Sequence, residues 1–259
     1  MMRNLMVLGV ELACSIIIPP ISNNHQDITL MKRLLLIIIM IPVMLSSTAQ
    51  EKLIALSFDD GPNLTTTVKM LDVLKKHGVK ASFFCIGKNI TPETVQSMIR
   101  AHREGHDIEN HSLTHCAIPS LTPDSMTTEI QTTSDLIEHY VGQRPQLFRP
   151  PYIAVSKEMF EAIPLTFICG EGCEDWVAEV SADKRYETML QHARDGLIFL
   201  LHDFEGNDNT VEAVDRIIPV LKKNGFTFVT VRELFRRKGV QPQKGILYSD
   251  VFQATPWEK

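Results

Sequence analysis

Two pairs of side chains in this sequence could hold a metal ion or move a proton. Asp59 and Asp60 are adjacent in SFDDGP, and His111 and His115 lie four residues apart in HSLTH. The first pattern is more often a turn, because Gly and Pro punctuate loops. The two imidazoles would share one face if their segment turns helically, but a chain with nine His produces such spacing by chance. Neither pair is decisive alone.

Two further clusters bring a cation, an aromatic ring and another imidazole. Arg149 and Tyr152 flank two prolines, which fix the backbone between the guanidinium and the ring. His202 ends the apolar run IFLLH. A surface Arg on a rigid loop and a structural His are the ordinary interpretations of these patterns. These clusters gain meaning only when they are combined with the first two.

Together the clusters supply the groups needed to hydrolyse an amide or an ester. Two His and one Asp form a nitrogen and oxygen ligand set that suits Zn²⁺ and leaves an open position for water. A second carboxylate beside the metal can act as general base, and a separate His can act as general acid. The sequence therefore predicts metal-assisted hydrolysis if the fold brings these residues together.

Alternating strand and helix patterns would place the clusters at one end of a parallel sheet. Seven short segments, most of them apolar, are predicted as strands: 53–58, 81–86, 106–110, 147–149, 165–169, 197–201 and 226–231. The predicted helices are 66–76, 92–103, 123–140, 211–223 and 231–237. All four clusters follow strands, and reactive residues of a parallel α/β barrel gather at the carboxyl ends of its strands. We therefore expect an α/β fold shaped as a barrel.

The composition is that of an ordinary globular protein. The 259 residues are 44% hydrophobic and 22% charged, which argues against disorder and against a small disulfide scaffold. The net charge is −5 and no long Lys/Arg run occurs, so there is no electrostatic footprint for nucleic acid. Without a linker or a repeat, 50–237 is predicted to form one catalytic domain, and 238–259 an irregular tail packed on the barrel.

Residues 31–49 have the three parts of a secretory signal peptide. Lys32 and Arg33 precede the uncharged apolar run 34–45, and small residues follow at 47–49. The apolar run is too short to span a bilayer, which needs about 20 residues. We expect cleavage of 31–49, export to the periplasm or the extracellular space, and no stable membrane span in the mature protein. Since a signal peptide begins at its own Met, 1–30 is expected to be a mis-assigned extension upstream of Met31.

Five motifs resemble, in order and spacing, those of the polysaccharide deacetylase family, carbohydrate esterase family 4. They are SFDDGP at 57–62, HSLTH at 111–115, RPPY at 149–152, EDW at 174–176 and LLH at 200–202. The resemblance implies a distorted (β/α) barrel of seven parallel strands. It also implies a secreted hydrolase that uses a metal-activated water to remove acetyl groups from N-acetylated glycans, either peptidoglycan or a chitin-like polymer. The implied cofactor is one divalent metal ion, with Zn²⁺ as the first choice and Co²⁺ or Ni²⁺ as alternatives.

The resemblance also implies a role for each site residue. Asp59 would be the general base, held and oriented by Arg149, and His202 would protonate the departing amine. The implied metal ligands are Asp60, His111 and His115. The implied substrate contacts are the backbone N–H of Tyr152, toward the oxyanion, and the side chains of Trp176 and Leu200, around the acetyl group.

One position departs from the family pattern. The fourth motif of the family carries an acid three residues before the Asp of the Asp-Trp pair, where it tunes the catalytic His, and Gly172 stands there. Glu171 or Asp175 could replace that acid, or another group could tune the His. Cys169 and Cys173 flank the same loop. They could form a disulfide only if the loop coils back, since the two Cα atoms must lie within about 7 Å.

Three other functions stay open at the level of sequence. An acetyl-xylan esterase would use the same chemistry, and an ester needs less help from the acid. A non-catalytic glycan-binding barrel would be expected to lose the base, a ligand or the acid, all of which are present. A metallophosphodiesterase often needs two metals, whereas the sequence offers ligands for one. The expected partner is an acetylated polysaccharide, and no protein partner is indicated.

Overall fold

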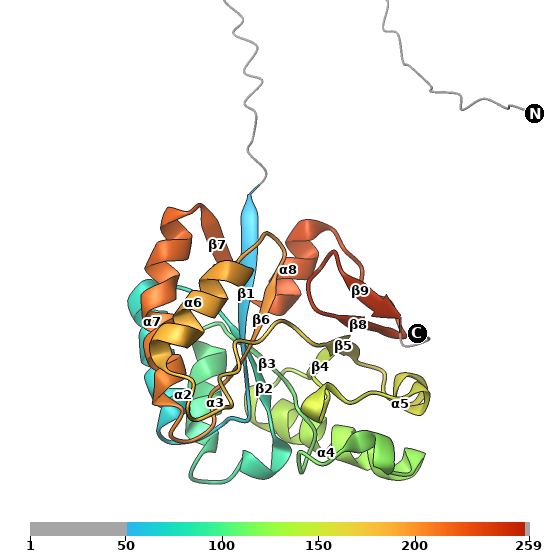
Figure 1. Cartoon of the computed structure of the whole chain (residues 1–259). Coiled ribbons are helices and arrows are strands. Elements are labelled where there is room, and N and C mark those ends of the chain that lie inside the picture. Colours follow the sequence, from blue (N-terminus) through green and yellow to red (C-terminus); the bar gives the residue numbers. More distant parts are fainter. Residues whose placement is uncertain (1–50, 257–259) are drawn as a thin grey trace, which may run out of the picture. The chain divides into compact units, whose positions relative to one another are not determined.

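The computed structural model describes residues 51–256 of the chain (Figure 1). The predicted extension at 1–30, the predicted signal peptide at 31–49 and the last three residues lie outside this part. The described residues contain the predicted domain and most of the predicted tail.

Seven parallel strands, β1 to β7, form most of a curled sheet of nine strands. Six of them run in the order β6-β1-β2-β3-β4-β5, and β7 pairs with β1. Their bounds are β1 (Lys52–Asp59), β2 (Ser82–Cys85), β3 (Asp107–Asn110), β4 (Leu147–Phe148), β5 (Thr166–Ile168), β6 (Ile198–His202) and β7 (Phe226–Val229). The strands confirm the expected α/β class and the distorted barrel of seven parallel strands, and each ends within two residues of its predicted bounds.

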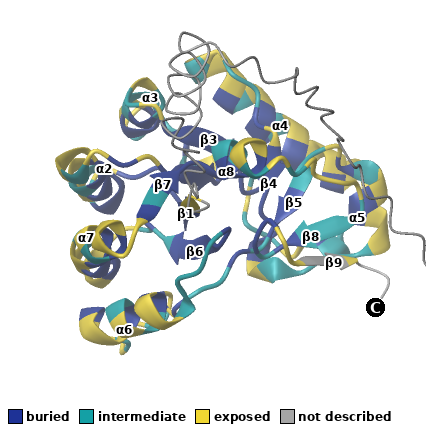
Figure 2. Ribbon diagram, turned by 90° about the horizontal axis from the view of Figure 1, so that it is seen from above, coloured by how far each residue is buried: buried dark blue, intermediate teal, exposed yellow. Residues whose placement is uncertain are grey.

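Helices cover the outer side of the sheet (Figure 2). Their bounds are α2 (Thr66–His77), α3 (Val95–Arg103), α4 (Pro123–Val141), α5 (Lys157–Ala162), α6 (Ala182–His192), α7 (Asp208–Lys223) and α8 (Val231–Lys238). Single turns of 3₁₀ helix occupy Gly87–Asn89, Ile118–Ser120 and Pro151–Ile153. Seen from above, α2, α3, α6 and α7 lie around β1, β6 and β7. No helix in residues 51–256 combines the length and the apolar character needed to cross a membrane.

Helix α4 shows how local sequence sets the ends of a helix. Thr122 accepts the backbone N–H of Ser125, and Pro123 occupies the first helical position, where its missing N–H costs nothing. Gly142 ends the helix with a left-handed φ of 72° and donates its N–H to the carbonyl of Glu138. These signals are short and local, so both ends of the helix were predicted to within one residue.

Two helices were missed and two were misplaced by three residues. Helix α6 buries only Ala182, Arg185 and Met189, so no apolar stripe marks it in the sequence. Helix α5 has six residues, too few to show a helical period. Helix α3 begins at Val95 and α7 at Asp208, whereas the sequence predicted starts at 92 and 211.

The tail predicted to be irregular contains two short strands. Strand β8 (Ile246–Tyr248) lies parallel to β5, and β9 (Ala254–Pro256) pairs antiparallel with β8. Tyr248 and Val251 are buried in a cluster with Phe235 of α8 and Ile168 of β5. The expectation of an irregular tail was wrong, because three-residue strands are too short for an alternating pattern to be visible.

The free edge of β6 is met by two loop segments. Glu171, which follows β5, donates its N–H to the carbonyl of Ile198 and accepts the N–H of Leu200, both at 2.9 Å. Asp250, which follows β8, forms an isolated bridge to Leu197. The loop that carries the fourth motif is thus attached by backbone hydrogen bonds to the strand that carries the fifth.

Strand β1 lies at the centre of the sheet and positions the site. It pairs with β2, β6 and β7, and its residues from Leu53 to Asp59 are buried. A strand buried on both faces is a nearly continuous apolar run, as LIALSF is. In the register of β1 with β6, Asp59 is the partner of His202, so the two predicted catalytic residues emerge side by side.

Candidate active site

Two carboxylates leave the carboxyl end of β1 together. Asp59 is the last residue of the strand, and Asp60 follows it with a left-handed φ of 79°. Successive side chains of a strand point to opposite faces, so the turn at Asp60 lets both carboxylates line the same pocket. Asn89 stabilises this turn by donating from Nδ2 to the carbonyl of Asp60 at 2.7 Å.

Asp60, His111 and His115 each offer one ligand atom, and these atoms lie within 4.8 Å of one another. Asp60 Oδ1 is 3.5 Å from His111 Nε2 and 3.6 Å from His115 Nε2. This oxygen is buried and has no hydrogen-bond partner among residues 51–256, which a bound cation would explain. Two imidazoles and one carboxylate suit Zn²⁺ and leave a coordination position open. The residues present therefore fit a divalent metal.

The two histidines reach the site from a loop. Asn110 Oδ1 accepts the N–H of Ser112 at 2.8 Å, and Ser112 Oγ accepts the N–H of His115 at 3.1 Å. Ser112 and His115 both have positive φ, 65° and 59°. The helical turn considered from the spacing was therefore wrong. The rings of His111 and His115 nevertheless meet, with centroids 4.9 Å apart.

Neighbouring groups favour the unprotonated donor atoms. His111 donates from Nδ1 to the carbonyl of Arg149 at 2.7 Å, which leaves the lone pair of Nε2 free to bind a metal ion. Burial and the nearby His111 lower the pKa of His115, so its neutral imidazole is favoured. Burial raises the pKa of Asp60, but the adjacent His111 lowers it overall.

Arg149 holds Asp59 from the buried side of the site. Its side chain is fully buried and donates from Nη1 to Asp59 Oδ1 at 2.6 Å and from Nη2 to Ser57 Oγ at 2.7 Å. The guanidinium lies over the ring of Phe84, 4.2 Å from its centroid. These charge-assisted bonds fix the orientation of the carboxylate and compensate its charge.

Loss of Arg149 is expected to destabilise the fold. Arg149→Met would leave Asp59 as a buried charge without its partner and should lower the free energy of unfolding by about 3–5 kcal/mol. Arg144→Met is the matched control, because Arg144 makes only exposed pairs with Asp135 and Glu138 and should cost less than about 1 kcal/mol. Urea denaturation measures both losses. Equal losses would contradict the buried pairing.

His202 ends β6 and is fixed by Asp175. Asp175 is fully buried, accepts Nδ1–H of His202 at Oδ1 (2.8 Å), and accepts the backbone N–H of His202 at Oδ2 (2.7 Å). Burial lowers the pKa of His202, but the hydrogen bond and charge of Asp175, with the charges of Asp59 and Asp60, raise it to about 9. The imidazole is therefore charged at neutral pH.

Asp175, one of the two candidates to replace an acid at position 172, is the one that binds His202. Glu171, the other candidate, pairs instead with Arg194, with Oε2 2.8 Å from Nη1. Gly172 leaves space for an aromatic ring, since a Cβ there would lie 3.0 Å from the indole of Trp176. The indole centroid is 5.6 Å from that of the His202 imidazole. The missing side chain at 172 thus lets Trp176 pack beside the histidine.

Eight of the nine predicted site residues line one pocket of about 570 Å³: Asp59, Asp60, His111, His115, Tyr152, Trp176, Leu200 and His202. Arg149, the ninth, contacts Asp59 from the buried side. Tyr152 and Trp176 are 72% and 54% exposed, so they offer rings to a substrate. Tyr152 has a left-handed φ of 57°, and its ring centroid lies 4.8 Å from that of His115. The pocket also contains residues to which the sequence gave no role: Pro150, Ile153, Cys169 and Gly170.

Spacing alone would have misidentified one histidine pair. His102 and His106 are also four residues apart, but neither lines the pocket. His106 is buried, and its Nδ1 accepts the N–H of Ala81 at 3.0 Å. The two cysteines beside the fourth motif do not form the disulfide considered from the sequence. Cys169 and Cys173 are both free thiols.

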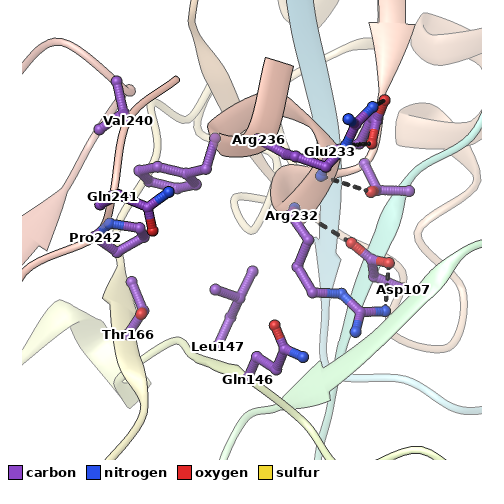
Figure 3. A pocket seen from close by; sticks show the side chains of 12 residues that line it. Asp107, Gln146, Leu147, Thr166, Arg232, Glu233, Arg236, Val240, Gln241 and Pro242 are labelled. Carbon is purple, nitrogen blue, oxygen red and sulfur yellow. Dashed lines mark hydrogen bonds and ion pairs between the residues drawn. The ribbon is translucent and has the colours of Figure 1, made fainter. Parts of the chain in front are cut away.

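A second pocket lies at the amino end of the strands (Figure 3). Its volume is about 560 Å³, and its lining includes Asp107 and Thr166, which begin β3 and β5, together with residues of α8. Its charged side chains pair with one another: Arg232 lies 2.6 Å from Asp107, and Arg236 pairs with Glu233. The catalytic groups lie at the opposite end of the sheet, so this pocket has no part in the site.

Comparison with known proteins identifies the family. A model of the polysaccharide deacetylase family matches residues 46–165. A peptidoglycan-N-acetylglucosamine deacetylase of Bacillus cereus is 38% identical over 198 residues, which cover 73% of this chain and 90% of that protein. The chain belongs to the polysaccharide deacetylase family. This deacetylase is a hydrolase, as its five motifs predicted.

Two further relatives of the deacetylase are named for xylan. A bifunctional xylanase/deacetylase of Pseudobutyrivibrio xylanivorans is 44% identical over 197 residues, 76% of this chain, and the chain spans only 33% of that protein's length. A family 4 acetyl xylan esterase from Clostridium thermocellum, solved with a cobalt ion, is 38% identical with a TM-score of 0.74. The match covers 77% of this chain and 99% of that one, which confirms the fold.

Proposed function

We propose that this deacetylase removes acetyl groups from N-acetylated glycans, either peptidoglycan or a chitin-like polymer, with the help of one divalent metal ion. The observation that carries the proposal is the content of a single pocket. Three ligand atoms within 4.8 Å of one another adjoin a carboxylate held by a buried guanidinium and a charged histidine. Amide hydrolysis by a metal-assisted route needs these groups.

Asp60, His111 and His115 would hold the metal ion. The unpartnered, buried Oδ1 of Asp60 supports this assignment. Zn²⁺ is our first choice because of the nitrogen and oxygen donor set, with Co²⁺ and Ni²⁺ as alternatives. When bound, the ion would supply Lewis acidity, which polarises a carbonyl oxygen and acidifies water.

Asp59 is proposed as the general base. Arg149 engages its Oδ1 at 2.6 Å, so Oδ2 is the oxygen left to accept a proton from the attacking water. Oδ2 lies 3.8 Å from Nε2 of His111, at the edge of the ligand group. Arg149 keeps this oxygen directed there because it fixes the other half of the carboxylate.

Tyr152, Trp176 and Leu200 are proposed to contact the acetyl group. The backbone N–H of Tyr152 would donate to the oxyanion. Its left-handed backbone supports this role, since residues in unfavourable backbone conformations cluster at functional sites. Leu200 and Trp176 line the same pocket and offer apolar surface to the methyl group.

His202 is proposed to protonate the departing amine, and this predicts the alkaline limb of the pH profile. The pKa of about 9 keeps the acid protonated at neutral pH, so kcat should fall as the pH rises through about 9. Asp175→Asn removes the negative charge that helps to raise this pKa, so the limb should move to lower pH. Acetate release measured across the alkaline range gives the limb for both proteins. An unmoved limb would contradict the role of Asp175.

Removal of O-acetyl groups from xylan is the second candidate activity. It is favoured by the relatives named for xylan, at 44% and 38% identity. The charged His202 favours the amide, because an amine leaving group needs a proton more than an alcohol does.

Two other functions receive less support. A non-catalytic glycan-binding barrel would be expected to have lost the base, a ligand or the acid, and all of them stand in the pocket. A metallophosphodiesterase often uses two metals. In the part of the chain that the structure describes, a single three-ligand group is found.

A substrate panel tests the proposed function. Acetate release would be measured with zinc-loaded protein on N-acetylglucosamine oligomers, peptidoglycan and acetylated xylan at equal acetyl concentration. We expect release from the N-acetylated glycans. Release from xylan alone would replace the first candidate by the second, and no release from any substrate would favour the non-catalytic barrel.

Export to the periplasm or the extracellular space is also proposed. Its support is the predicted signal peptide at 31–49, which lies outside the described residues. Mass spectrometry of the exported protein should find an amino terminus near residue 50. A mature chain that begins before Met31 would contradict both the cleavage and the proposed start.

A further inference from the structure

We infer that Arg185 and Thr210 are positioning residues, which hold Asp175 so that it fixes the imidazole of His202. This inference rests on the proposed function of the site. Neither residue lines the pocket, and they act through a chain of hydrogen bonds from α6 and α7 to the end of β6.

Asp175 accepts hydrogen bonds on both of its carboxylate oxygens. Oδ1 accepts Nδ1–H of His202 at 2.8 Å, and Oδ2 accepts the backbone N–H of His202 at 2.7 Å. Oδ2 also accepts the hydroxyl of Thr210 at 3.0 Å. Since Asp175 is fully buried, water cannot replace any of these donors, and each one restricts the carboxylate.

The direction of the bond from Thr210 is determined by its other neighbour. Arg185 Nη1 lies 2.7 Å from Thr210 Oγ1, and a guanidinium can only donate. The hydroxyl therefore accepts from Arg185 and has its single proton left for Asp175. The order of donation, from Arg185 through Thr210 to Asp175, is fixed.

Arg185 is a buried cation whose direct partners are all neutral. It is 2% exposed, and its four acceptors are the carbonyls of Val177 and Val180, Oδ1 of Asn207 and the hydroxyl of Thr210. No ion pair among residues 51–256 includes its guanidinium. A buried cation needs a compensating charge, and Asp175 lies one hydroxyl away.

Arg185 reaches the histidine by a second branch as well. Asn207 accepts from Arg185 at Oδ1 and donates from Nδ2 to the carbonyl of His202 at 2.9 Å. Val177 and Val180 belong to the segment that follows Trp176. The guanidinium of Arg185 therefore connects the loop of the fourth motif to two parts of His202. It reaches the imidazole ring through Thr210 and Asp175, and the backbone carbonyl through Asn207.

This arrangement matters because position 172 has no side chain. Among residues 51–256, Asp175 is the hydrogen-bond partner of the His202 ring, so the placement of Asp175 sets the orientation of Nδ1–H. The charged groups that raise the pKa of His202 are Asp175 from the loop and Asp59 and Asp60 from the end of β1. Of these, Asp175 is the one that Arg185 and Thr210 control.

The test uses Thr210→Val in the zinc-loaded full chain. We expect kcat for acetate release to fall about tenfold or more with KM unchanged, the loss expected for one hydrogen bond to a charged group. We also expect the pKa of His202, followed by NMR, to fall toward that of free histidine as Asp175 loosens. Thr210→Ser, which keeps the hydroxyl, should restore both values. Thr210→Ala gives the same readouts if the valine variant does not fold.

Thr133→Val is the matched control. Thr133 is also a fully buried helical threonine, and its hydroxyl donates to the carbonyl of Glu129 within its own helix. This variant should change neither kcat nor the pKa of His202. An unchanged pKa and kcat in Thr210→Val, or failure of Thr210→Ser to restore them, would overturn the inference. If the wild type releases no acetate, the proposed function fails, while the pKa of His202 still tests the positioning.

Discussion

Asp59→Asn is expected to lower kcat for acetate release by about 10²–10⁴-fold, the range that a general base contributes. The amide can still accept a hydrogen bond from Arg149, so the geometry at Oδ1 is preserved. It cannot accept the proton of the attacking water. Because the proposed ligands are Asp60, His111 and His115, the bound metal should remain at one equivalent. The measurements are the rate of acetate release and the metal content of the purified variant.

The control for this variant is Asp72→Asn. Asp72 is also paired with an arginine, since its Oδ1 lies 2.7 Å from Nη2 of Arg100, but the pair is exposed. Its substitution should leave the rate unchanged. If Asp59→Asn kept the wild-type rate, Asp59 would be removed from the mechanism, and if it lost the metal, Asp59 would have to be counted among the ligands.

His115→Ala is expected to weaken Zn²⁺ affinity by more than about 100-fold and to lower acetate release with it. Loss of an outer partner of a ligand already costs about 10–100-fold in affinity, and this variant removes the ligand itself. His115 lies on a loop and its side chain is 27% exposed, so the fold should survive. Zinc titration by calorimetry measures the affinity.

His102→Ala is the matched control for His115. His102 has the same spacing to a second histidine but lies on α3, away from the pocket. Its substitution should change neither the affinity nor the rate. Equal zinc affinity in His115→Ala and the wild type would exclude His115 from the metal site.

Most of the site could be predicted from the sequence because a buried parallel strand is an apolar run, so the polar residues at its carboxyl end are easily recognised. The run LIALSF is apolar, so the two carboxylates that follow it are conspicuous, and IFLLH ends in a histidine for the same reason. Strand register then places Asp59 beside His202. Most of the seven strands were predictable for the same reason, since they are short apolar segments, whereas β3 has the polar sequence DIEN.

The network behind the acid could not be predicted. Arg185 and Thr210 belong to α6 and the first turn of α7, where their residue types are unremarkable. Their function depends on how these two helices pack, which no local pattern encodes. The sequence could not decide whether Glu171 or Asp175 binds His202, for a related reason. Glu171 pairs with Arg194, and Arg194 also binds Asp250 of the tail, which is distant in sequence.

The approach of the ligands also depended on backbone details. The spacing of His111 and His115 suggested a helical turn, but a loop with two left-handed residues, Ser112 and His115, brings the two imidazoles together. The left-handed φ at Asp60 likewise departs from what a non-glycine residue ordinarily adopts. Such conformations are stabilised by tertiary hydrogen bonds, including that from Asn89, and so are invisible to a local sequence pattern.

Acetate release before and after metal restoration tests the central claim most directly. Protein stripped with a chelator would be assayed on N-acetylglucosamine oligomers, and again after addition of about one equivalent of Zn²⁺. We predict that the stripped protein releases no acetate and that the added metal restores the rate. A stripped, metal-free protein that releases acetate at the full rate would contradict the account of this site.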